Sequence, residues 1–102
     1  MAFPPSFIDE LVARNPIEDV VGQHVSLRRA GANMFGLCPF HGEKTASFSV
    51  APDKGIYYCF GCHKGGGVIN FQMEVEGLSY PDAVRALAKR VGMDVPEDEQ
   101  YQ

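Results

Sequence analysis

Residues 35–50, FGLCPFHGEKTASFSV, and residues 56–62, IYYCFGC, contain the pattern that decides the fold. A C-x2-H pair at residues 38–41 is followed, after seventeen intervening residues, by a C-x2-C pair at residues 59–62. Two ligands at this spacing can wrap one tight backbone turn around a metal ion, and a hairpin can bring the second pair to complete a tetrahedron. The sequence therefore predicts one zinc ion, held by Cys38, His41, Cys59 and Cys62.

The predicted zinc is expected to be structural rather than catalytic. Four protein ligands leave no coordination position for a substrate water. The chain has 102 residues, so it can form one small domain with a modest core. Zinc binding contributes about 10–16 kcal/mol in small metal-binding peptides, whereas a typical domain has a net stability of ~5–15 kcal/mol. We therefore expect the metal to hold the fold together.

Two other interpretations of these residues stay open at this point. Cys59 and Cys62 alone could form a thioredoxin-like redox pair, although no βαβ pattern surrounds them. His63 could replace His41 as a ligand, although it directly follows Cys62 and adjacent residues rarely reach the same metal. The remaining histidine, His24, is expected to be a solvated surface residue.

The cysteine count and the charge limit the class of protein. Three cysteines, an odd number, fit a disulfide framework poorly and favour the reducing cytoplasm. No apolar run is long enough for a membrane helix, so we expect no membrane partner. The net charge of −4 argues against a simple cationic nucleic-acid binder. Residues 20–71 nevertheless carry five basic and two acidic side chains, so the predicted metal-binding segment is locally basic.

Periodicity and capping residues predict helices at both ends of the chain. The first 22 residues favour two short helices, one beginning at Phe7 with Ser6 as its cap and one entered through Asn15 and Pro16. Near the other end, a helix is expected from about residue 68 to residue 76, and a further one from Ser79 to Gly92.

The middle of the chain has the alternating pattern of short strands. Strands are expected at residues 25–28, 48–50 and 56–59, with a turn at 52–55 between the last two. The three glycines at 65–67 are expected to be either a flexible exit from the metal-binding turn or an anion site before the next helix. Together these elements predict an α+β fold, a small antiparallel zinc-ribbon sheet flanked by short helices at both ends.

Aromatic residues are frequent in the predicted ribbon, beside its basic residues. They are Phe35, Phe40, Phe48, Tyr57, Tyr58 and Phe60. Alternation along a strand puts Tyr57 and Tyr58 on opposite faces, so one of them must face away from the core. An exposed ring beside Lys and Arg suits single-stranded nucleic acid, whose bases stack at roughly 1–3 kcal/mol each while cations hold the backbone. The alternative that these rings form the core stays open. For Phe40 and Phe60, packing in the core or within the metal-binding turns is favoured more strongly.

The two quoted stretches, with the glycine-rich turn into VINF at 68–71, closely resemble the N-terminal zinc-binding domain of bacterial DnaG-type DNA primase, a CHC2-type zinc finger. The resemblance extends from the helices near residue 6 to about Val95. It implies a zinc-binding domain at residues 1–95 that binds the single-stranded DNA template and helps to select the initiation site for RNA primer synthesis. Residues 96–102 would then be the acidic start of a linker.

The same resemblance implies the remaining partners. A separate polymerase domain of the parent nucleotidyltransferase would make the primer during DNA replication, and the replicative helicase would bind the parent's C-terminal domain. Neither domain is expected within these 102 residues, so the chain alone is expected to carry no catalytic site.

The resemblance also assigns roles to basic residues. Lys44 matches the lysine of the family's E-K-T motif, and Arg28 and Arg29 fall on its basic strand. Ala46 and the pair His63–Lys64 depart from the family's pattern, which leaves the preferred template triplet open. With the aromatic argument, the predicted DNA contacts are Arg28, Arg29, Lys44, Lys54, Tyr57 and Lys64, and the choice between Tyr57 and Tyr58 is open.

A rival hypothesis is a protein-docking zinc module that uses the helical ends of the chain. Its motivation is the acidic character of those ends and the apolar face predicted along residues 80–91. The two hypotheses are compatible, because a template-binding domain must also contact its polymerase domain.

Overall fold

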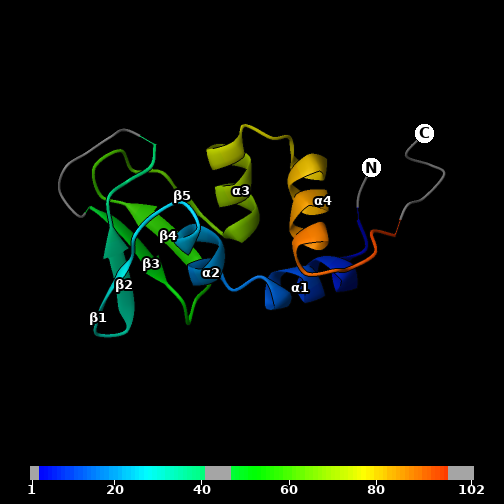
Figure 1. Cartoon of the computed structure of the whole chain (residues 1–102), viewed down its shortest axis with the longest axis horizontal. Coiled ribbons are helices and arrows are strands. Elements are labelled where there is room, and N and C mark those ends of the chain that lie inside the picture. Colours follow the sequence, from blue (N-terminus) through cyan, green and yellow to red (C-terminus); the bar gives the residue numbers. More distant parts are fainter. Residues whose placement is uncertain (1–2, 41–46, 97–102) are drawn as a thin grey trace.

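The computed structural model describes residues 3–40 and 47–96, and Figure 1 shows how their elements are arranged. Two helices come first, α1 (Pro5–Arg14) and α2 (Ile17–Gly22). The strands follow as β1 (Arg28–Ala30), β2 (Asn33–Gly36), β3 (Phe48–Ala51), β4 (Ile56–Cys59) and β5 (Gly65–Gly66). Two more helices, α3 (Val68–Glu76) and α4 (Tyr80–Arg90), follow the sheet. The predicted α+β class, an antiparallel sheet with helices at both ends, is confirmed.

The sheet is an antiparallel meander in the order β1-β2-β3-β4-β5. Residues paired across neighbouring strands share a face, and successive residues of a strand alternate between faces. Phe48 pairs with Cys59 and Val50 with Tyr57, and all four are at most 2% exposed. We call this face the inner face, and the face that carries Ser49 and Tyr58 the outer face.

Aromatic rings fill the space between the inner face and α3. Phe48 and Tyr57 stack with ring centroids 5.5 Å apart, and Phe71 of α3 meets both rings at 5.5–6.0 Å. Phe40, from the first metal-binding turn, closes the cluster at 5.8 Å from Phe71. Burying each of these side chains contributes roughly 1.5–3 kcal/mol. The metal-binding turn is therefore tied to the core by Phe40, as the interpretation of that ring as a core residue predicted.

The helical end of the molecule packs α1 and α3 against α4, as Figure 1 shows. The apolar face of α4 is fully used in this packing, because its side chains are at most 1% exposed: Ala83, Val84, Leu87 and Ala88. The docking hypothesis relied on an apolar face along residues 80–91, and most of that face is used inside the molecule, although Tyr80 stays 40% exposed. Asn15, only 1% exposed, donates through its side-chain nitrogen to the carbonyls of Leu11 and Leu87, which joins α1 to α4.

Some element boundaries differ from the sequence predictions for identifiable reasons. α1 begins at Pro5, with Pro4 as its N-cap, so the predicted start at Phe7 with Ser6 as the cap is wrong. A proline suits the first helical position because its missing N–H has no partner there in any case. The first strand begins at Arg28 rather than residue 25, because Val25 ends a turn after α2, where its N–H donates to the Val21 carbonyl.

The prediction for the last helix is confirmed at its start. Ser79 caps α4, and its hydroxyl accepts a hydrogen bond from the N–H of Asp82.

The prediction of a flexible exit at residues 65–67 is wrong, because two of these glycines belong to the sheet. Gly65 pairs with Tyr58 and Gly66 pairs with Tyr57, which forms β5. In the described part of the chain, no helix is long and apolar enough to cross a membrane.

Candidate metal centre

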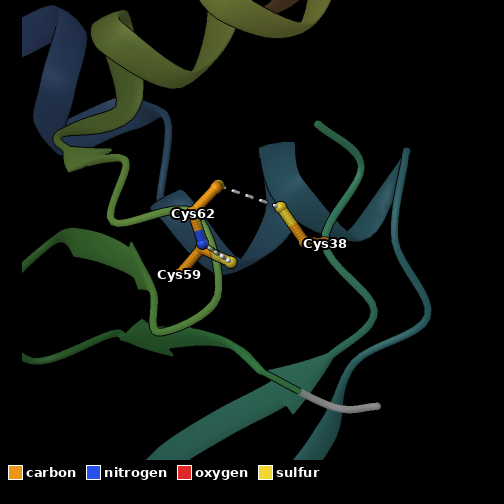
Figure 2. A group of neighbouring side chains, drawn as sticks. All are labelled: Cys38, Cys59 and Cys62. Atoms are coloured by element: carbon orange, nitrogen blue, oxygen red, sulfur yellow. Dashed lines mark hydrogen bonds between the residues drawn. The ribbon is translucent and has the colours of Figure 1, made fainter. Parts of the chain in front are cut away.

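Three thiols converge at one end of the sheet. Cys38 follows β2, Cys59 ends β4, and Cys62 lies in the turn after it. Their sulfur atoms all lie within 4.8 Å of one another, and Figure 2 shows Cys38 facing the other two from a separate segment. The sulfurs of Cys38 and Cys62 are 3.8 Å apart. In a tetrahedron with Zn–S bonds near 2.3 Å, two sulfurs lie about 3.8 Å apart, so the spacing fits zinc.

Backbone N–H groups point at the sulfurs, as metal-binding turns require. The N–H of Phe40 donates to Cys38 Sγ at 3.4 Å. Cys59 Sγ accepts from the N–H groups of Gly61 at 3.3 Å and Cys62 at 3.5 Å, and Figure 2 draws the second of these bonds. The hydroxyl of Ser47 also lies 3.7 Å from Cys59 Sγ. These groups stabilise negative charge on sulfur, which is the state that binds zinc.

The same surroundings change the acidity of two thiols. Burial raises the pKa of Cys38 to about 12. Burial acts in the same direction on Cys59, but the N–H donors of Cys62 and Gly61 and the Ser47 hydroxyl outweigh it and lower the pKa of Cys59 to about 6. Cys59 is therefore the thiol that the protein itself prepares as a thiolate. A bound cation would favour the thiolate form of Cys38 as well.

The described residues supply three of the four predicted ligands. The predicted fourth, His41, lies outside the described residues, so its role stays a prediction. The alternative ligand His63 has its Nδ1 2.8 Å from the hydroxyl of Tyr58, and it is not part of the thiol group. The redox alternative needs Cys59 and Cys62 as an isolated pair, whereas Cys38 lies within the same cluster. The donor set favours a closed structural zinc site.

The residues predicted to contact DNA do not all lie on one face of the domain. Arg28 pairs with Phe35 and lies on the outer face, whereas Arg29 pairs with Met34 on the other side of β1. Lys54 lies in the β3–β4 turn, away from the cysteines, where it lines a cavity of ≈ 300 Å³ with residues of the α1–α2 junction. The ammonium of Lys64 is 3.4 Å from a carboxylate oxygen of Glu74 on α3. Lys44 lies outside the described residues.

The prediction that Tyr57 contacts DNA is wrong, because its ring is in the core. Tyr57 is 2% exposed, and burial raises its pKa to about 12. Its neighbour Tyr58 takes the outward position, at 36% exposed. The alternation argument predicted one inward and one outward ring, but the sequence has no signal that says which face the helices cover.

Sequence reasoning missed the exposure of Phe60. We expected this ring to pack in the metal-binding turn, yet it is 62% exposed and meets Tyr58 edge-on at 5.1 Å. The other residues of the outer face follow from the register in which the strands pair. One row crosses the sheet from Arg28 through Phe35, Ser49 and Tyr58 to Gly65.

An antiparallel ribbon with thiols at one end and helices over one face defines a zinc-ribbon domain. The chain belongs to the CHC2 zinc finger family, whose pattern it matches over residues 3–102. Its cofactor is a structural zinc ion, in agreement with the cysteine cluster.

Relatives of known name agree with this assignment. The chain is 52% identical over 96 residues to a DNA primase of Pseudomonas aeruginosa and 53% identical over 94 residues to one of Neisseria meningitidis. These matches cover 94% and 92% of this chain but only 14% and 16% of the relatives. A solved structure, the zinc-binding and RNA polymerase domains of the Aquifex aeolicus primase, superimposes with a TM-score of 0.82 at 41% identity. That match covers 93% of this chain and 23% of the other.

Proposed function

We propose that this chain is the template-binding domain of a DNA primase and that it binds single-stranded DNA on the outer face of its sheet. The parent would be a nucleotidyltransferase that makes RNA primers for DNA replication, and its polymerase domain would lie outside these 102 residues. The names of the relatives and the share of their length that the chain spans support this proposal. The catalytic site would belong to the polymerase domain and not to this chain.

One observation carries the proposal, the row across the outer face. It places a cation, Arg28, in line with the side chains of Phe35, Ser49 and Tyr58 on the face that the helices leave open. Aromatic rings bind unstacked bases, a hydroxyl can accept or donate a hydrogen bond, and a guanidinium binds phosphate. Phe60 extends the aromatic surface beyond Tyr58. The combination suits a single strand better than a duplex, whose bases are not free to stack on a protein ring.

Zinc and the basic residues have separate roles in this proposal. His41 completes the ligand set of the three cysteines, so that the end of the sheet is rigid. Lys44, three residues after His41, and Arg28 contact phosphates. Arg29, Lys54 and Lys64 lie away from the row and contribute a general positive field to a strand that passes the sheet. Tyr58 replaces Tyr57 as the tyrosine that contacts a base.

The domain limits and the larger assembly are part of the same proposal. Residues 1–95 form the template-binding domain, and residues 96–102 lead into the polymerase domain, with which the domain selects the initiation site. The replicative helicase contacts the parent through another domain. The protein acts in the cytoplasm as part of the bacterial replisome, where the reducing environment keeps thiols available to bind zinc.

Binding of a short labelled single strand, measured by fluorescence anisotropy at several salt concentrations, tests the proposal. We expect weak binding that falls steeply with salt, because cations release counterions from phosphates. The R28A variant should bind at least ~3-fold more weakly, whereas K89A, an exposed cation on α4 away from the sheet, should bind like the wild type. No binding, or equal binding by R28A and the wild type, would contradict the proposal.

A further inference from the structure

The ring of Tyr58 is held from three sides. Its hydroxyl is 2.8 Å from Nδ1 of His63. The ring of Phe60 meets it with centroids 5.1 Å apart and planes inclined by 72°. Gly65 lies beside it so closely that a Cβ on this glycine would come within 2.9 Å of Tyr58 Cδ1. An exposed tyrosine normally samples several rotamers, so these three contacts preorganise the ring.

His63 adopts a left-handed backbone conformation, which is uncommon for residues other than glycine. Its φ of 64° makes it the one non-glycine residue at positive φ in the described parts of the chain. The turn that closes the second thiol pair requires this conformation, since the His63 N–H donates to the carbonyl of Cys59 at 2.8 Å. Glycine fits such a position without strain. Because histidine stands here although glycine would fit without strain, we infer that the histidine side chain has a role of its own.

The rings that this arrangement fixes face solvent rather than the core. Phe60 is 62% exposed and Tyr58 is 36% exposed. Because the two planes are nearly perpendicular, the pair offers two surfaces that meet in a corner. Three strand spacings, about 14 Å, separate Tyr58 from Arg28 along the same row. A short single strand whose phosphate lies on Arg28 can therefore reach the corner with a base.

We propose that Tyr58, Phe60 and His63 form a binding site for one unstacked nucleobase, in which Phe60 stacks on the base, Tyr58 contacts the edge of the base, and His63 positions Tyr58 through its Nδ1. This site rests on the proposed function and gives it a defined place where one base of the strand is held. His63 is a positioning residue, because it acts through the hydroxyl of Tyr58. The hydrogen bond between the Tyr58 hydroxyl and Nδ1 fixes the ring of Tyr58 against Phe60.

Single-stranded oligonucleotides with 2-aminopurine at one position at a time test the site with the whole 102-residue chain. Its fluorescence changes when an aromatic ring stacks on it, so the wild type should change the signal at one position much more than at the others. F60A should lose this local signal and at least ~5-fold in affinity, in line with the usual contribution of stacking on one base. Zinc content and thermal melting of each variant show whether it is folded.

Two milder variants keep the test valid if F60A does not fold. Y58F and H63G should each weaken the local signal and the affinity by ~2–5-fold, and the double variant should lose no more than either one, because both remove the same hydrogen bond. H63N tolerates positive φ and can still bond to the tyrosine, so it should restore part of the signal. Y80F, which removes a hydroxyl from a partly exposed tyrosine on α4, is the matched control and should match the wild type.

The outcomes separate the base site from the function on which it rests. If the wild type binds DNA and R28A weakens it, while F60A, Y58F and H63G keep both affinity and local signal, the base site is wrong and the proposed function stands. If the wild type binds no single-stranded DNA at all, both are wrong. Additive losses in the Y58F and H63G double variant would contradict the positioning role of His63.

Discussion

At the residue scale, Cys59 is one of the three thiols on which the metal centre depends. Its sulfur accepts two backbone hydrogen bonds, and its pKa is lowered to about 6. We expect C59S to lose zinc and cooperative thermal melting, because the ligand that the protein prepares as a thiolate is gone. Metal analysis and circular dichroism measure both effects.

A matched control for this prediction is S47A, which removes only the hydroxyl near Cys59 Sγ. This variant should stay folded and bind zinc ~10-fold more weakly, as is typical for the loss of a group that supports a ligand. A C59S variant that retains one zinc ion and melts cooperatively would contradict the role of the metal in the fold.

Asn15 is the buried polar residue that joins the two ends of the chain. Besides donating to the carbonyls of Leu11 and Leu87, its side-chain oxygen accepts a hydrogen bond from Arg90 at 3.0 Å. N15A leaves the Leu11 and Leu87 carbonyls without this donor at a buried position, so it should lower the free energy of unfolding by about 1–3 kcal/mol. Urea denaturation measures the change. N33A, at an exposed position, should stay within ~0.5 kcal/mol of the wild type, and equal stability of both variants would refute the argument.

The sequence predicted the cysteine ligands more reliably than it predicted the residues that would contact DNA. Ligand chemistry and spacing are local, so the C-x2-C pair and Cys38 could be read from the sequence and are found together. The orientation of Tyr57 and Tyr58 depends on which face α3 covers, which is a tertiary property. The contact between His63 and Tyr58 depends on a left-handed turn at His63, a conformation that is uncommon outside glycine, so no sequence rule indicated it.

At the scale of elements, β5 shows why glycine is required at the edge of the sheet. A Cβ on Gly65 would lie 2.9 Å from Tyr58 Cδ1 and 3.0 Å from the carbonyl oxygen of Tyr57. G65A should therefore displace β5 or the Tyr58 ring, lower the stability by about 1–3 kcal/mol, and weaken single-strand binding. Chemical denaturation and anisotropy measure the two effects.

Gly67 provides the control for this prediction. A Cβ there would lie 3.7 Å from its nearest neighbour, the carbonyl oxygen of Gly55, which is an ordinary contact, and the φ of −92° suits other residues. G67A should therefore change stability and binding much less than G65A. If G65A is as stable as G67A, the close approach of β5 to Tyr58 is not a constraint.

Elements with strong local signals were predicted well, and elements made by pairing were not. The Ser79 cap and the left-handed Gly77 after α3 match the predicted helix limits. β5 consists of two glycines, which have a low strand propensity. It forms because its backbone pairs with the open edge of β4. The start of β1 was shifted because Val25 is buried by the helical turn before it, so an apolar residue there did not indicate a strand.

At the scale of the whole molecule, the zinc end and the helical end share one core. The aromatic cluster joins the first metal-binding turn through Phe40 to α3, and α3 packs on α4. The fold class could be predicted because the ligand pairs, the alternating strands and the capped helices all indicated one architecture. The outer face could not be predicted in full, because its row depends on a register that the turn lengths alone do not fix.

X-ray absorption at the zinc edge of the purified chain is the decisive measurement for the metal centre. We predict one zinc ion per chain, bound by the sulfurs of Cys38, Cys59 and Cys62 at about 2.3 Å and by one nitrogen of His41 at about 2.0 Å. A fully folded chain without stoichiometric zinc, or a spectrum with fewer than three sulfur ligands, would contradict it.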